Sequence, residues 1–167
     1  MKLLLVCTGN ICRSPMAQAI ARRLLDAGGR RDVAVESAGT AAYDGAPASE
    51  GAYLIALEHG LDLSAHRARQ ITRDLVAGAD LVLGMSPHHV ERAAALGGDG
   101  RSFLLGAYAG RQGADAQVED PFGGDLEEYR ATFGRLEALL ADAIARLPPG
   151  PPPSSPPPPS DAPPGHD

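Results

Sequence analysis

Short, nearly continuous apolar runs alternate with longer stretches in which apolar residues recur at every third or fourth position, and this alternation constrains the fold more than any other feature. Turn-forming residues bound the short runs, which are KLLLV at 2–6, VAVES at 33–37, ADLVLGM at 79–85 and RSFLLG at 101–106. The longer stretches have helical periodicity and cover residues 14–28, 46–60, 86–98 and 124–147. Uninterrupted apolar runs of this kind are typical of strands in a sheet covered on both faces.

The repeated order of strand and then helix predicts a parallel sheet with right-handed crossovers. We therefore expect an α/β fold in three αβα layers. Its central sheet has four parallel strands and is doubly wound in a flavodoxin-like or Rossmann-like manner. Such sheets bind ligands beyond the carboxyl ends of their strands, at the point where the strand order reverses.

The end of the chain, residues 148–167, is PPGPPPSSPPPPSDAPPGHD and contains no leucine, isoleucine, valine or aromatic residue. Because such a segment has nothing to bury, we expect a disordered, partly polyproline-II tail after a single folded domain at residues 1–147. Two roles stay open for the tail: a ligand for a proline-binding domain, or an extension that the protein tolerates.

The net charge of the chain is −6, and the tail holds two acids and no Lys or Arg, so residues 1–147 carry about −4. This balance argues against non-specific binding to nucleic acid or to an anionic membrane surface. No apolar run approaches the roughly 20 residues of a membrane span. We expect a cytoplasmic protein, in which cysteines stay reduced unless they have a redox role.

Both cysteines of the chain lie in VCTGNICRSP at 6–15, directly after the first expected strand. Three interpretations compete: a disulfide or metal pair, a phosphate-binding loop that contains a nucleophile, and buried filler. Ser14 is a good N-cap and Pro15 a good first-turn residue, so the loop ends at a helix N-terminus, where anions are favoured.

The residue types in this loop suit phosphate chemistry. Gly9 and Asn10 can adopt left-handed backbone conformations that point successive amide N–H groups inward as an anion nest. Arg13 adds a bidentate fork for two phosphate oxygens. A Cys7 thiolate at the bottom of the nest is stabilised by the same donors, which makes it a nucleophile aimed at phosphorus.

The Cys-x5-Arg-Ser pattern in CTGNICRS, with SAGT at 37–40, HRARQ at 66–70 and DPFGG at 120–124, resembles the low-molecular-weight protein tyrosine phosphatase family. The resemblance covers residues 1–147. It implies a hydrolase that dephosphorylates phosphotyrosine in protein substrates through a phosphocysteine intermediate. It implies no metal and no organic cofactor, because the nucleophile and the acid suffice.

The resemblance also implies a role for individual residues. Cys7 attacks phosphorus, and Arg13 holds the phosphoryl oxygens together with the amides of the loop residues Thr8, Gly9, Asn10, Ile11 and Cys12. Ser14 donates a hydrogen bond to the thiolate. Asp120 is the general acid and then the general base, and Pro121 biases it towards an extended backbone.

Further residues support the loop or border the substrate. Asn10, Ser37 and His66 resemble the family's network that holds the strained turn, while Ile11 and Phe122 form the wall beside the substrate. Cys12 matches a second family cysteine that pairs with Cys7 on oxidation; a buried small hydrophobe is the competing interpretation.

Three other functions deserve comparison. Protein arginine phosphatases resemble this chain over the same span, but in that branch threonine stands at the position of Ile11, whose apolar side chain favours an aromatic ring. Arsenate reduction requires further thiols, and the chain has none beyond Cys7 and Cys12. A catalytically silent phosphate-binding module does not explain a complete set of nucleophile, loop and acid.

The adjacent residues His88 and His89 suggest a metal site, but their spacing argues against one. His88 and His89 are adjacent, so they cannot face one metal ion from the same side of a helix, and no third ligand lies at a useful spacing. We expect both to be surface histidines.

Overall fold

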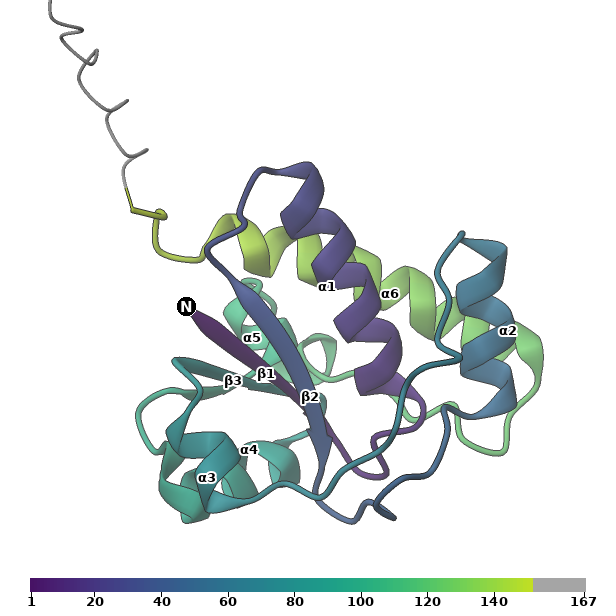
Figure 1. Cartoon of the computed structure of the whole chain (residues 1–167), viewed down its shortest axis with the longest axis horizontal. Coiled ribbons are helices and arrows are strands. Elements are labelled where there is room, and N and C mark those ends of the chain that lie inside the picture. The colour runs from purple at the N-terminus through teal and green to yellow at the C-terminus, as the bar shows by residue number, and fades with distance from the viewer. Residues whose placement is uncertain (152–167) are drawn as a thin grey trace, which may run out of the picture.

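The computed structural model describes residues 1–151 and contains one sheet of four parallel strands (Figure 1). The strands are β1 (Lys2–Cys7), β2 (Ala34–Gly39), β3 (Leu81–Gly84) and β4 (Ser102–Leu104), in the order β2-β1-β3-β4. Val6 of β1 pairs with Ala38 of β2 on one side and with Gly84 of β3 on the other. The predicted α/β class and parallel sheet are confirmed. The strand order reverses at β1, so its carboxyl end is the switch point at which such folds bind ligands.

Helices cover both faces of the sheet (Figure 1). The bounds of the main helices are α1 (Arg13–Ala27), α2 (Glu50–Glu58), α3 (Arg73–Ala77), α4 (Pro87–Ala93), α5 (Leu105–Tyr108) and α6 (Leu126–Ala145). Helices α1, α2 and α6 lie on one side of the sheet, and α3 and α4 lie on the other (Figure 1). A three-layer αβα arrangement results.

Strand β1 shows why its sequence is apolar without alternation. Leu3 and Leu5 pack into the larger core cluster with residues of α1 and α6, whereas Leu4 and Val6 pack into the smaller cluster with residues of α3 and α4. Successive strand side chains point to opposite faces, and here both faces are buried.

Several predicted element boundaries are wrong. Residues 101–106 do not form one strand, because β4 ends at Leu104 and α5 begins at Leu105. Gly106, in this helix, packs directly against a distant segment: a Cβ there would lie 2.4 Å from the Ala116 carbonyl oxygen. The helix expected from residue 46 starts only at Glu50, where the Ser49 side chain accepts from the Ala52 N–H. The helix expected over 86–98 is α-helical only to Ala93. A π-helical turn, Ala94–Gly98, follows it, and Gly97 distorts this turn with a φ of 105°.

The structure adds a short helix that the sequence pattern did not predict, α3, and a 3-10 turn at Gly113–Ala116. Over residues 1–151, no helix is both long and apolar enough to cross a membrane. Residues 152–167 lie outside the described part of the chain, so the predicted disorder of the tail and its proline-binding partner stay predictions.

Candidate active site

The loop between β1 and α1 turns sharply at Asn10, which has a φ of 56°. Asparagine tolerates this left-handed conformation better than most residues with a side chain. Gly9, the other residue for which we considered a left-handed backbone, does not have a positive φ. Gly39 at the end of β2 lets the loop approach the sheet, because a Cβ there would lie 2.4 Å from the Thr8 carbonyl oxygen and 2.9 Å from the Asn10 nitrogen.

The hydrogen-bond network fixes where the Ser14 hydroxyl points. Helix α1 begins at Arg13 with Cys12 as the N-cap, so the prediction that Ser14 caps the helix is wrong. Asn10 Nδ2 donates to Ser14 Oγ at 2.7 Å, and Ser14 Oγ lies 2.9 Å from Cys7 Sγ. The amide nitrogen can only donate, so Asn10 does not use the Ser14 hydrogen. When Cys7 is a thiolate, which has no hydrogen to give, Ser14 is therefore the donor in their contact, and this use of the hydroxyl replaces the cap.

Asn10 is the centre of the loop's support. Its side chain is fully buried, Nδ2 also donates to Ser37 Oγ at 2.9 Å, and Oδ1 accepts from the Arg69 N–H at 3.0 Å. The ring nitrogen Nε2 of His66 lies 2.6 Å from the Asn10 carbonyl oxygen, and burial lowers the pKa of His66. The structure thus brings Asn10, Ser37 and His66 together.

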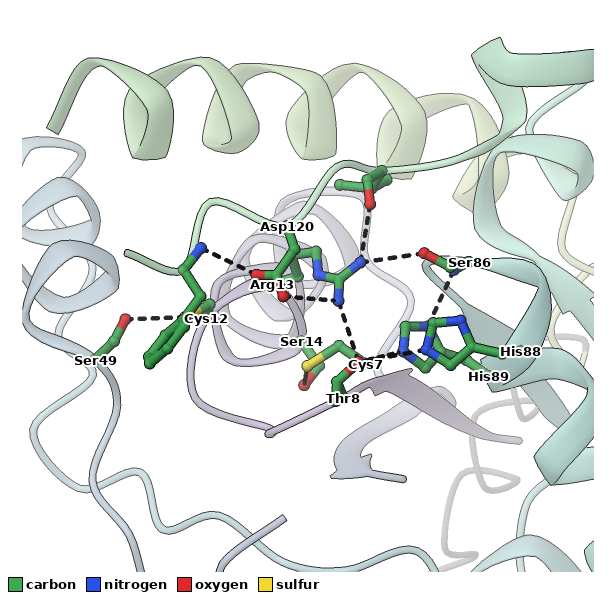
Figure 2. Close-up of polar contacts among 12 residues, drawn as sticks. Cys7, Thr8, Cys12, Arg13, Ser14, Ser49, Ser86, His88, His89 and Asp120 are labelled. Atoms are coloured by element: carbon green, nitrogen blue, oxygen red, sulfur yellow. Dashed lines mark hydrogen bonds and ion pairs between the residues drawn. The ribbon is translucent and has the colours of Figure 1, made fainter. Parts of the chain in front are cut away.

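Arg13 is buried under the loop, with only 3% of its surface exposed. Its Nη1 donates to the Val118 carbonyl at 2.9 Å and to Ser86 Oγ at 3.3 Å (Figure 2). Its Nε has no hydrogen-bond partner among residues 1–151. A buried guanidinium nitrogen without a partner is costly, and an oxyanion ligand would satisfy it.

Asp120 reaches the same place from the segment that precedes α6. Its Oδ2 lies 3.6 Å from Arg13 Nη2, and its Oδ1 accepts from the Phe122 N–H at 3.0 Å. The Asp120 side chain is about half exposed, at 48%. A carboxyl group in this position can exchange protons with solvent and with a group bound beside Arg13.

These residues enclose a pocket of about 180 Å³ at the carboxyl end of β1. Its lining is Cys7, Thr8, Gly9, Ile11, Cys12, Arg13, Asp120 and Phe122. Phe122 lies at the mouth, with 67% of its surface exposed. The pocket therefore combines a thiol at its floor, a cation and a carboxyl group in its wall, and apolar side chains at its mouth.

Cys12 is buried next to the pocket and is not disulfide-bonded to Cys7. Its Sγ lies 3.2 Å from Ser49 Oγ and 3.4 Å from the Tyr129 hydroxyl. Burial raises the pKa of the Cys12 thiol and raises the pKa of Tyr129 to about 12. At neutral pH both groups keep their protons.

The expectation that both His88 and His89 lie on the surface is wrong for His89. Its side chain is fully buried, because His89 turns back over the start of α4 and accepts from the Ser86 N–H at Nδ1. Burial lowers the pKa of His89 to about 3. His88 is exposed.

Sequence reasoning missed several residues at this site, among them Ser49, Ser86, His89 and Tyr129. They lie far from the loop in sequence and carry no local pattern that marks them as part of this site. The parallel pairing of β1 with β3 brings the segment after β3 to the loop, where Ser86 contacts Arg13 and His89 contacts Thr8. Within residues 1–151, no group of three or more His, Cys, Asp or Glu side chains is arranged to hold a metal ion.

Comparison with known proteins yields matches along almost all of the described chain. The family model described as low molecular weight phosphotyrosine protein phosphatase matches residues 2–148. The chain is 38% identical over 150 residues to a protein-arginine-phosphatase of Geobacillus stearothermophilus, covering 87% of this chain and 95% of that protein.

Solved structures resemble the fold closely. A low molecular weight protein tyrosine phosphatase from T. tengcongensis superposes with a TM-score of 0.81 at 38% identity, covering 88% of this chain and 99% of that one. The arginine phosphatase YwlE, as a cysteine-to-serine mutant with a phosphorylated active-site serine, gives 0.82 at 35% identity, covering 88% and 95%.

Proposed function

The chain belongs to the low-molecular-weight phosphotyrosine protein phosphatase family, and from this we propose that it hydrolyses phosphotyrosine in protein substrates, with Cys7 as nucleophile, Arg13 as phosphoryl-binding residue and Asp120 as acid and base. The observation that carries the proposal is a single pocket lined by all three side chains. They come from segments more than a hundred residues apart in sequence.

In the first step, the Cys7 thiolate attacks phosphorus and the bond from phosphorus to the tyrosine oxygen breaks. Arg13 stabilises the negative charge on the non-bridging oxygens, with the loop amides beside it at the N-terminus of α1. Asp120 transfers its proton to the leaving phenolic oxygen, which yields tyrosine and a phosphocysteine. The phosphorylated active-site serine of the related arginine phosphatase supports a covalent intermediate at the nucleophile's position.

In the second step, the Asp120 carboxylate takes a proton from a water molecule, which attacks phosphorus. The bond from sulfur to phosphorus breaks, and inorganic phosphate leaves. The Ser14 hydroxyl, which Asn10 Nδ2 holds 2.9 Å from Cys7 Sγ, donates its hydrogen to the departing thiolate and stabilises it. The Ser14 hydroxyl therefore matters most for this hydrolysis.

The side chains at the pocket mouth favour an aromatic leaving group. Ile11 and Phe122 are apolar and offer no side-chain hydrogen bond, whereas a phosphoguanidinium has several N–H groups that need acceptors. Among residues 1–151, Asp120 is the one carboxylate in the pocket lining, and it already lies 3.6 Å from Arg13 Nη2. This lining suits the phenyl ring of phosphotyrosine.

Phosphoarginine is the second candidate substrate, because the Geobacillus relative at 38% identity is an arginine phosphatase. The experiment compares wild type and Ile11→Thr on matched phosphotyrosine and phosphoarginine peptides. We expect the wild type to prefer phosphotyrosine and Ile11→Thr to shift the ratio of kcat/KM towards phosphoarginine. A wild type that prefers phosphoarginine would keep the cysteine mechanism and assign the other substrate.

Cys7→Ser is the matched control for the mechanism. It removes the thiolate but leaves Arg13 and the loop amides, so turnover should disappear while binding of inorganic phosphate persists. Retention of near-normal turnover by Cys7→Ser would overturn the proposed nucleophile.

Two further parts of the proposal concern regulation and location. We assign Cys12 as the redox partner of Cys7, because both cysteines line the same pocket. The Cys12 thiol must lose its proton before it attacks a Cys7 sulfenic acid, the product of a peroxide oxidant; the S–S bond then forms as the sulfenic oxygen leaves as water. The protein is placed in the cytoplasm, where a reducing environment keeps both thiols available.

A further inference from the structure

His89 is held in one tautomer by its backbone partner. The Ser86 N–H donates to His89 Nδ1 at 3.0 Å, and a backbone N–H cannot accept a hydrogen bond. The neutral ring therefore carries its hydrogen on Nε2, which lies 2.9 Å from Thr8 Oγ1. Nε2 is the donor in that contact, so His89 delivers a hydrogen bond to Thr8.

Thr8 receives a second, longer contact from Arg13. The guanidinium nitrogen Nη2, which is always a donor, lies 3.5 Å from Thr8 Oγ1. A hydroxyl oxygen has two lone pairs, and His89 and Arg13 point hydrogens at both of them. The hydrogen of the Thr8 hydroxyl must then find an acceptor elsewhere.

The available directions for that hydrogen are the pocket and His88. Thr8 lines the pocket, and Arg13 Nη2 lies between Thr8 Oγ1 and Asp120 Oδ2, at 3.5 and 3.6 Å (Figure 2). His88 Nε2 lies 3.4 Å from Thr8 Oγ1, about as far as Arg13 Nη2, and it accepts only in the tautomer that carries the hydrogen on Nδ1. An anionic phosphoryl oxygen beside Arg13 is the stronger acceptor, because its hydrogen bond is charge-assisted.

We propose that the Thr8 hydroxyl donates a hydrogen bond to a non-bridging oxygen of the bound phosphoryl group, and that His89 is the positioning residue that aims it. This inference rests on the proposed function of the pocket.

The packing of α4 against the sheet supports a fixed His89. Gly84 at the end of β3 lies so close to α4 that a Cβ there would meet His89 Cβ at 2.9 Å and the Val90 nitrogen at 3.2 Å. The glycine thus lets His89 approach the carboxyl end of β1. Together with the Ser86 N–H, this contact leaves the ring little freedom to turn away from Thr8.

The test compares two substitutions at Thr8. Thr8→Val keeps the shape of the side chain but removes the hydroxyl, and Thr8→Ser keeps the hydroxyl. We expect Thr8→Val to lower kcat/KM on a phosphotyrosine peptide and to weaken binding of inorganic phosphate, measured by calorimetry, by roughly tenfold or more. Thr8→Ser should remain within about threefold of wild type.

Two substitutions at His89 separate aiming from helix capping. The asparagine side chain reaches only the position of Nδ1, so His89→Asn keeps an acceptor for the Ser86 N–H but loses the donor to Thr8. The longer glutamine side chain reaches the position of Nε2, so His89→Gln can still donate to Thr8. We expect His89→Asn to weaken phosphate binding like Thr8→Val and His89→Gln to weaken it less. The double variant Thr8→Val with His89→Asn should lose little more than either single variant, because both remove one interaction.

Specific outcomes overturn the inference. Thr8→Val with wild-type phosphate binding would show that the hydroxyl does not contact the ligand. An equal loss in His88→Ala would show that the hydrogen points to His88. If the His89 variants do not fold, the comparison of Thr8→Val with Thr8→Ser still decides whether the Thr8 hydroxyl contacts the bound phosphate. The calorimetric assay needs no turnover, so it separates this inference from a failure of the proposed phosphatase activity.

Discussion

Replacement of Asn10 by alanine tests whether one buried side chain holds the phosphate-binding loop. The change removes the hydrogen bonds to Ser14, Ser37 and the Arg69 N–H, and each is worth about 1 kcal/mol net. It also places a Cβ-bearing residue without a compensating side chain at a φ of 56°, at a further cost of about 1 kcal/mol. We expect Asn10→Ala to lower the free energy of unfolding by about 4 kcal/mol, measured by urea denaturation.

Asn10→Gly is the matched control, because glycine adopts the left-handed conformation without steric strain. It should lose about 3 kcal/mol, which reflects the hydrogen bonds alone. Both variants should also lower kcat, since Ser14 then lacks the Asn10 hydrogen bond that holds its hydroxyl beside Cys7. A loss below about 1 kcal/mol for Asn10→Ala would refute the account of the network, and equal losses in the two variants would refute the account of the backbone.

Three further predictions follow from single features of the site. Gly39→Ala should abolish phosphate binding in calorimetry, because its Cβ would lie 2.4 Å from the Thr8 carbonyl oxygen and 2.9 Å from the Asn10 nitrogen, both of them backbone atoms. Asp120→Ala should reduce kcat/KM, which reports the first step, roughly a hundredfold or more on phosphotyrosine but much less on an aryl phosphate with a highly acidic phenol, which leaves without a proton; equal losses of kcat/KM on the two substrates would contradict its role as acid. Because burial lowers the pKa of His89 to about 3, the unfolded state binds the proton more readily, so stability contributed by the neutral ring is complete above about pH 6.5 and declines as the pH falls towards 3. Urea denaturation of wild type and His89→Gln between pH 7 and pH 4 checks this, and the variant should depend less on pH.

The fold was largely predictable because it depends on patterns that are local in sequence. The run KLLLV buries its side chains on both faces of the sheet, and the helical stretch after it supplies the cover for one of them. Boundaries were less predictable. Helix α2 begins at Glu50 rather than residue 46 because Ser49 caps it while the Ser49 N–H donates to the Ile11 carbonyl oxygen of the loop. Strand β4 gives way to α5 at Leu105, where Gly106 packs against the backbone of Ala116.

The loop chemistry was also visible in the sequence, since Cys7, Asn10 and Arg13 lie within seven residues and their types suit an oxyanion. The prediction that Ser14 is the N-cap was wrong, whereas the hydrogen bond to Cys7 that the resemblance implied is within reach in the structure. As a residue before a helix it looked like an N-cap, but its hydroxyl lies between Asn10 Nδ2 and Cys7 Sγ instead. Local preference gave way to a tertiary hydrogen-bond network.

The sequence by itself determined the residue types at the switch point of the sheet: a thiol, an arginine and a turn that tolerates a positive φ. Tertiary structure alone decided that His89 is buried and that Thr8 is its partner. In the sequence the two histidines are adjacent on a short helix, and nothing local distinguishes them. The pairing of β1 with β3 brings both rings near Thr8 but buries only His89, which makes the shorter contact. A hydrogen bond depends on the positions of two groups in space, and for groups 81 residues apart only the packing of the whole sheet fixes those positions.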